Sequence, residues 1–173
     1  NILKINADGR VSRGASEEER ITLLNYENEV ELQKLKYEEL NVKLDASVLK
    51  LEETQSSYIN DKKDLNNSQQ DLLQINKQIS ELEIKLEDPN STNNDLIAYN
   101  AAIDEKVNIE NKIIIIELDL KISEGEYLDA RDKNESISNL TSIEKEILDN
   151  LKVSLAIAAN KANRDDYNVY TDI

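Results

Sequence analysis

Apolar side chains recur most regularly in the first half of the chain. Between residues 16 and 86, ten of them follow one another at a strict seven-residue spacing: Leu23, Val30, Tyr37, Leu44, Leu51, Tyr58, Leu65, Leu72, Ile79 and Leu86. A sustained seven-residue repeat is typical of one of the two core positions of a coiled coil, here called position a. The pattern predicts a long helix over residues 16–86, with these ten residues as its core or oligomer seam.

The second core position, d, is apolar only towards the two ends of this helix. Its central members are Ser47, Thr54, Asp61 and Ser68. Asp61 predicts either a polar layer that sets the register and limits the choice of oligomer, or a hydrated gap in a wide seam. Tyr37 and Tyr58, at position a, are interpreted as core residues whose hydroxyls reach the edge of the seam. A recognition role for the two tyrosines is the alternative.

The same helix carries a second apolar face. Its members lie at or near position f, on the opposite side from a: Ile21, Leu24, Leu32, Leu35, Val42 and Leu49. A two-stranded coiled coil leaves this side exposed. The pattern therefore predicts that a further helix packs on the first half of helix 16–86.

The helical pattern stops over residues 87–95. Pro89 lacks a backbone donor, and the surrounding Asn, Ser, Thr and Asp residues favour turns; Asn94 or Asp95 can cap the next helix. A second helix is predicted over residues 96–165, so that arms 16–86 and 95–165 form an antiparallel hairpin. Gly125 and the polar stretch that follows predict a kink or short break within residues 125–136.

The apolar residues of the second helix follow a helical spacing less strictly. Those expected to face its core are Leu96, Ile103, Val107, Ile114, Leu118, Leu140, Ile143, Ile147, Leu151, Leu155, Ala158 and Ala162. The polar Asn134 stands where a core residue is due. The region around Ile147 is apolar on more than one side, so the open end of the hairpin is expected to pack against additional helices.

Both ends of the chain differ from the helical arms. Residues 1–15 predict a short β/turn segment, and Ser16 with Glu19 predicts a capping box at the start of the first helix. Residues 166–173 alternate as a strand does and predict a short extended segment. A hairpin would bring this segment beside Ile2–Ile5, where the two could form a small β element.

The composition supports an all-α, coiled-coil fold. The 173 residues include no Trp, Phe, Cys, Met or His, only three Gly and one Pro, and 33% of them are charged. The net charge of −15 argues against nucleic acid or an anionic membrane surface as a partner. No apolar run approaches the roughly 20 residues of a transmembrane helix. The absence of Met favours a piece of a longer polypeptide or a processed product.

No catalytic, cofactor-binding or metal site is predicted. Because the chain contains no His and no Cys, it lacks the commonest general bases, nucleophiles and soft metal ligands. The three glycines are too scattered to form a phosphate-binding loop. The paired acids Asp165 and Asp166 are interpreted as solvated charge at a helix end. The sequence therefore predicts a protein that is not an enzyme and has no small-molecule substrate.

The predicted function is that of a structural coiled-coil segment in a large assembly, acting as a rod, spacer or staple. Its expected partners are copies of itself, as a trimer or higher oligomer, and other structural proteins. The chain is rich in Asn, Ile and Lys, and its predicted architecture is a helical rod bracketed by short β segments. This combination is analogous to that of bacteriophage fibre, tail and neck proteins. This analogy favours a virion or another extracellular assembly. The alternatives are a coiled-coil arm of a cellular machine and a helical binding module for a protein partner, and a cytoplasmic location is the alternative setting.

Overall fold

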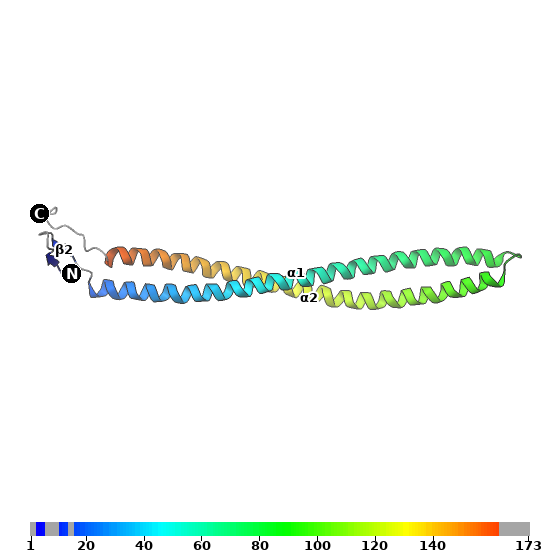
Figure 1. Ribbon diagram of the computed structural model, residues 1–173, viewed down its shortest axis with the longest axis horizontal. Helices are drawn as coiled ribbons and strands as arrows, with labels where there is room; N and C mark the ends of the chain where they lie inside the picture. Colours follow the sequence, from blue (N-terminus) through cyan, green and yellow to red (C-terminus); the bar gives the residue numbers. More distant parts are fainter. Residues whose placement is uncertain (1–2, 6–10, 14–15, 163–173) are drawn as a thin grey trace. The chain divides into compact units, whose positions relative to one another are not determined.

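Two long helices make up most of the molecule. The computed structural model describes residues 3–5, 11–13 and 16–162. Helix α1 (Glu17–Glu87) and helix α2 (Asn93–Ala162) run antiparallel and pack against each other (Figure 1). The all-α class and the helical hairpin predicted from the sequence are confirmed.

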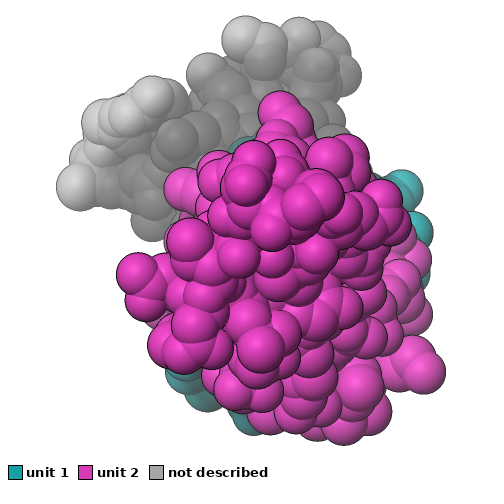
Figure 2. All heavy atoms as spheres, turned by 90° about the vertical axis from the view of Figure 1, so that its right-hand side faces the viewer, with its two compact units in different colours: residues 1–46, 135–173 teal, residues 47–134 magenta. Residues whose placement is uncertain are grey.

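The chain divides into two compact units, coloured separately in Figure 2. Unit 1 contains residues 1–46 and 135–173, and unit 2 contains residues 47–134. Each unit pairs one stretch of α1 with one stretch of α2, so the packing within each unit has its own set of facing side chains.

The N-terminal segment contains two short paired strands. Strand β1 (Leu3–Ile5) pairs antiparallel with strand β2 (Val11–Arg13), and Lys4 lies opposite Ser12. β1 thus has a backbone partner in its own segment. The C-terminal segment 166–173, for which pairing with Ile2–Ile5 was predicted, lies outside the described residues.

Local hydrogen bonds explain where the helices begin and end. Ser16 Oγ accepts a bond from the backbone N–H of Glu19 at 3.1 Å, as predicted for the N-cap of α1. α1 ends at Glu87, two residues before Pro89, because proline disfavours a helical conformation in the residue before it. At the start of α2, the Thr92 N–H donates to the carboxylate of Asp95 at 3.0 Å, so Asp95 satisfies a backbone donor at this helix end.

α2 continues without a break through residues 125–136. Gly125 lies within the helix, and an added Cβ there would meet no atom within 4 Å. A single glycine costs a helix only about 1 kcal/mol, which packing can offset. Ser123 is buried and Tyr127 half-buried against α1, so the residues on both sides of Gly125 are held in the helical conformation.

The side of α2 that faces α1 agrees with the predicted one only in part. Five residues that the sequence placed in its core are buried or half-buried: Ile103, Leu151, Leu155, Ala158 and Ala162. The other seven are exposed: Leu96, Val107, Ile114, Leu118, Leu140, Ile143 and Ile147. The buried and half-buried residues of α2 follow a seven-residue repeat instead: Tyr99, Lys106, Ile113, Leu120, Tyr127, Asn134, Thr141, Leu148, Leu155 and Ala162. A helix stays in contact with a partner of seven-residue periodicity only along its own seven-residue stripe, even where that stripe is less hydrophobic.

The second stripe of α2 in the interface is rich in small residues. It contains Ala102, Ser123, Ala130 and Ala158, all buried. Near the turn, Ala102 packs with Ile75 and Ile79 of α1 in an apolar cluster. Small side chains allow the two helices to approach closely, which explains why this stripe faces inwards.

Candidate functional site

The ten predicted seam residues of α1 lie on the side that contacts α2. Val30 and Ile79 are buried, with exposed fractions of 3% and 7%, and the other eight are half-buried. The d positions lie on the same side and are all buried or half-buried. In this structure the seam is the contact between the two arms of one chain.

The polar centre of the seam is closely packed. Ser68 has an exposed fraction of 2%, and Thr54 one of 4%. The Thr54 hydroxyl donates to the backbone carbonyl of Lys50 at 2.8 Å, so its polar atom is satisfied on its own helix. Asp61 is half-buried between these two residues. The structure therefore shows no wide, hydrated gap at Thr54 and Ser68.

Polar contacts also join the two helices directly. In unit 2, the Asn134 side-chain amide donates to Ser47 Oγ at 3.0 Å. The asparagine at a core position thus has a partner on α1. The Tyr58 ring contacts the Tyr127 ring of α2 edge to face, with 5.5 Å between centroids. The Lys62 ammonium lies 4.2 Å from the centre of the Tyr58 ring. Tyr58 is therefore a packing residue of the hairpin.

A buried carboxylate in unit 1 joins α2 to two residues of α1. The Gln33 side-chain amide donates to the Glu144 backbone carbonyl at 3.0 Å and also to its carboxylate. Lys36 Nζ lies 3.0 Å from Glu144 Oε1. The bond from Gln33, followed by that from Lys36, holds the pKa of Glu144 below its ordinary value. Glu144 was not predicted, although the seven-residue stripe through Leu151 and Ala158 includes its position.

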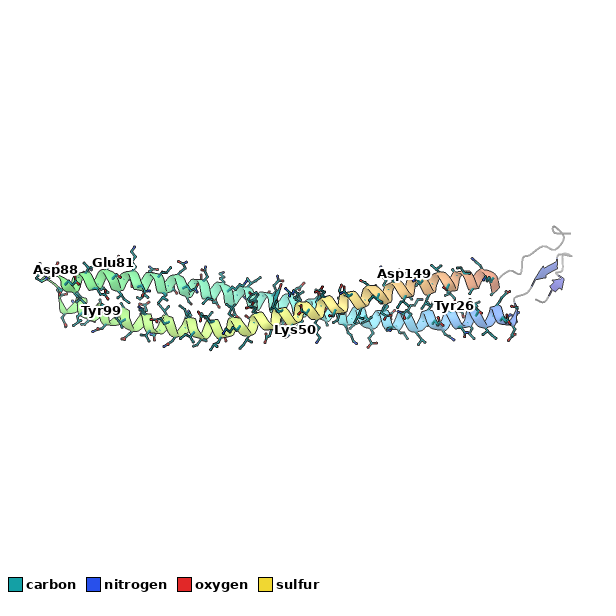
Figure 3. All side chains as sticks on the ribbon, turned by 180° about the vertical axis from the view of Figure 1, so that it is seen from behind. Tyr26, Lys50, Glu81, Asp88, Tyr99 and Asp149 are labelled. Carbon is teal, nitrogen blue, oxygen red and sulfur yellow. The ribbon has the colours of Figure 1, made fainter. Side chains whose placement is uncertain are left out.

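The second apolar face of α1 is exposed. Its six predicted members are Ile21, Leu24, Leu32, Leu35, Val42 and Leu49, and each is at least half exposed. Val42, for example, has an exposed fraction of 70%. α2 covers the a and d side of α1, so no described residue packs over this face. The outer sides of both helices carry projecting side chains (Figure 3).

α2 has exposed apolar side chains of its own. In unit 1 they are Leu140, Ile143, Ile147, Val153 and Ile157. In unit 2 they include Val107, Ile114, Ile115, Leu118 and Ile122. Exposed apolar patches of this extent mark interaction surfaces more often than they mark free surface.

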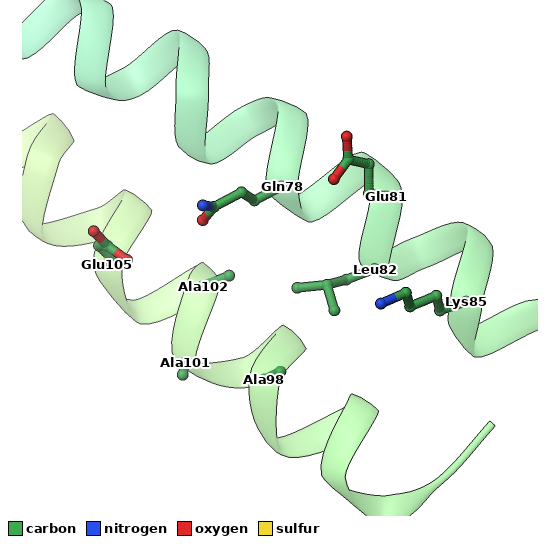
Figure 4. A pocket seen from close by; sticks show the side chains of 8 residues that line it. All are labelled: Gln78, Glu81, Leu82, Lys85, Ala98, Ala101, Ala102 and Glu105. Atoms are coloured by element: carbon green, nitrogen blue, oxygen red, sulfur yellow. The ribbon is translucent and has the colours of Figure 1, made fainter.

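An open groove lies between the helices near the turn (Figure 4). Ala98, Ala101 and Ala102 form its α2 wall, and Leu82 points towards them from α1. The groove exists because alanine leaves space beside the larger residues of α1. Four polar or charged residues also line the groove: Gln78, Glu81 and Lys85 of α1 and Glu105 of α2.

The described residues form neither a metal-binding cluster nor a membrane-spanning helix. Within residues 3–5, 11–13 and 16–162, no three His, Cys, Asp or Glu residues gather as metal ligands do. Neither α1 nor α2 is apolar enough along its described length to cross a membrane.

The candidate functional surfaces are therefore the exposed apolar faces of a two-helix coiled coil. No protein-family model matches the chain, and comparisons with curated proteins and with solved structures found no significant match.

Proposed function

We propose that this chain is a non-enzymatic structural segment of a larger assembly, acting as a rod, spacer or staple between other parts. The observation that carries the proposal is the combination of two features. In each unit, α1 and α2 share a seam of seven-residue periodicity, while large apolar side chains remain on their outer sides. Helices paired in this way are stiff, and uncovered apolar faces supply contact area for other chains.

The proposed partners are copies of the same chain and other structural proteins, and the function needs no cofactor. The sequence favours a trimer or a higher oligomer. The proposed setting is a virion fibre, tail or neck, or another extracellular assembly, supported by the architectural analogy alone. The net charge of −15 supports protein partners over nucleic acid.

A coiled-coil arm of a cellular machine is the second candidate. It is favoured by the near equality of the two arms, with 71 residues in α1 and 70 in α2. A binding module that uses the turn is less well supported, because residues 88–94 are polar or proline and exposed.

Light scattering combined with small-angle X-ray scattering of the purified chain tests the proposed function. The expected result is a particle with a longest dimension of about 100 Å, the length of a helix of some 70 residues, and with more than one chain. A compact particle with a single chain would contradict a structural rod.

A further inference from the structure

One side of the hairpin in unit 1 carries apolar side chains from both helices. Lys36 of α1 contacts Glu144 of α2, so the positions next to these two residues share this side of the hairpin. Its members follow the alternating three- and four-residue spacing of a helix stripe. We name this surface the docking face; it consists of Glu29, Leu32 and Lys36 of α1, and of Ser136, Leu140, Ile143, Ile147, Asn150, Ser154 and Ile157 of α2.

The docking face has no net charge, and all of its members are exposed except Ser154, which is half-buried. Leu32 has an exposed fraction of 69%, and Ile143 one of 54%. The part of the face on α2 contains no charged residue, and the part on α1 contains one acid and one base. In a chain with a net charge of −15, a neutral surface can meet its own copy without strong local repulsion.

The α2 part of the face is complementary to itself in an antiparallel pairing. If a two-fold axis passes beside Ile147, Leu140 meets Ser154 of the second copy and Ile143 meets Asn150. Ile157 then meets Ser136, and Ile147 meets its own equivalent. Apart from that central pair, each large apolar side chain faces a smaller or polar neutral one, an arrangement that lets two surfaces interlock.

The charged residues on the α1 part of the face are also complementary to themselves in an antiparallel pairing. Glu29 precedes Leu32 by three residues and Lys36 follows it by four. An antiparallel pairing centred on Leu32 therefore puts Glu29 of one copy beside Lys36 of the other, twice. Opposite charges placed in this way fix the register of an interface.

One axis can serve both helices. The bond from Gln33 to Glu144 shows which residues of α1 and α2 lie at the same level. Counting from it in opposite directions along the antiparallel helices brings Leu32 to within about one helical turn of Ile147. The centres of complementarity on α1 and α2 thus lie only about 3 Å apart along the hairpin, and an axis that passes between them serves both helices.

The contact area suits a reversible pair. Residues 136–157 of α2 extend over about 33 Å, residues 29–36 of α1 extend over about 12 Å, and each helix is about 10 Å wide. The footprint is then about 450 Å² on each copy and about 900 Å² in total, which lies in the range of weak, transient protein interfaces.

We propose that two copies of this chain associate through the docking face as an antiparallel, two-fold symmetric pair, with four helices packed together in the contact. This inference rests on the proposed structural function and specifies its first assembly step. Leu32 and the apolar residues of α2 are the buried centre of the contact, and Glu29 and Lys36 set its register. The exposed residues Ile21, Leu35 and Val42 lie outside it.

Surface substitutions with light scattering test the contact. Leu32→Glu and Ile143→Glu each place an acid in the centre of the face, and the expected result is a dissociation constant raised on the order of 100-fold. Both residues are exposed within a single chain, so the helical circular dichroism signal should not change. Leu73→Glu and Ile84→Glu are matched controls, because these exposed apolar residues of α1 lie in unit 2. The controls should associate as the unchanged chain does.

Engineered cysteines test the antiparallel direction, and the chain has none of its own. Under mild oxidation, a mixture of Leu140→Cys and Ser154→Cys chains should give the mixed disulfide, and neither chain alone should give a comparable yield. Like-with-like disulfides at both positions would show a parallel pairing and overturn the proposal.

The outcomes separate this inference from the proposed function. A multi-chain particle whose mass is unchanged by Leu32→Glu and Ile143→Glu overturns the docking face and leaves the structural role in place. An elongated particle with one chain overturns every form of self-association proposed here. A compact single chain overturns the structural role as well.

Discussion

Glu144 shows how one residue can connect the two helices. Its carboxylate accepts a hydrogen bond from Gln33 and lies beside the Lys36 ammonium. Both contacts favour the ionised form and hold its pKa below the ordinary value of a glutamate. A folded-state pKa below the unfolded one adds stability above the unfolded pKa, and this stability disappears as the pH falls through the folded pKa.

The first prediction concerns this carboxylate. At pH 7, Glu144→Gln should unfold at a lower temperature than the unchanged chain. The difference should begin to shrink as the pH falls below the unfolded glutamate value of about 4.3, and should vanish below the folded pKa. Thermal melts between pH 7 and pH 3 measure it. Glu146→Gln, at an exposed position of the same helix, controls for the loss of one charge; a pH-independent difference for Glu144→Gln would contradict the assignment.

Asp61 is the charged residue among the d positions of α1. It is half-buried, and the neighbouring d residues Thr54 and Ser68 are buried. If the carboxylate only weakens the seam, Asp61→Leu should stabilise the hairpin by about 1 kcal/mol, because apolar area replaces a partly desolvated charge. The midpoint of thermal unfolding should then rise by about 2–4 °C.

Asp64→Leu is the matched control for this second prediction, since Asp64 is exposed on the same helix. It should change the midpoint by less than Asp61→Leu does. A lower midpoint for Asp61→Leu would instead show that the carboxylate takes part in a polar layer that the fold requires.

At the scale of the element, α1 has two apolar faces with different roles. The seam residues Leu44 and Leu51 are half-buried against α2, whereas Val42 and Leu49 point away from it. The two pairs have the same seven-residue spacing. They therefore separate the contribution of the seam from that of the outer face.

The third prediction compares these pairs. Leu44→Asp with Leu51→Asp should cost about 2 kcal/mol or more at each position, because a charge replaces a packed side chain. The helical circular dichroism signal should fall or the unfolding midpoint should drop sharply. Val42→Asp with Leu49→Asp should leave the helical circular dichroism signal and the unfolding midpoint unchanged. Equal effects from the two pairs would argue against the proposed core.

At the scale of the whole molecule, the connection between the arms matters most. Ile75 of α1 and Ala102 of α2 belong to one apolar cluster within unit 2. A hairpin makes this contact inside one chain. Chains that exchange arms would make the same contact between two chains.

The fourth prediction uses this contact. Ile75→Cys with Ala102→Cys should form a disulfide within one chain, because the two residues pack together. Under denaturing conditions the product should migrate as a single chain. Leu73→Cys with Leu118→Cys, at exposed positions, should give little cross-link. A product of two chains with the first pair would show exchanged arms.

The sequence predicted much of this fold because local chemistry carries it. The scarcity of Gly and Pro, the Ser16 cap and the break around Pro89 are properties of short segments, and they suffice to predict two long helices and the turn between them. The repeat from Leu23 to Leu86 predicted which side of α1 packs. The residues of that repeat are buried or half-buried in the structure.

The tertiary structure alone decided which of the residues predicted for the core of α2 face inwards. Hydrophobicity pointed to residues such as Ile114, Leu118 and Ile143, yet these are exposed. The seven-residue repeat of α1 instead selects a stripe of α2 that matches its periodicity and includes small or polar residues such as Ala130 and Glu144. That choice depends on a partner that is distant in sequence, so the properties of α2 by itself could not determine it. The same choice leaves large apolar side chains of α2, such as Leu140 and Ile143, exposed and so creates the docking face.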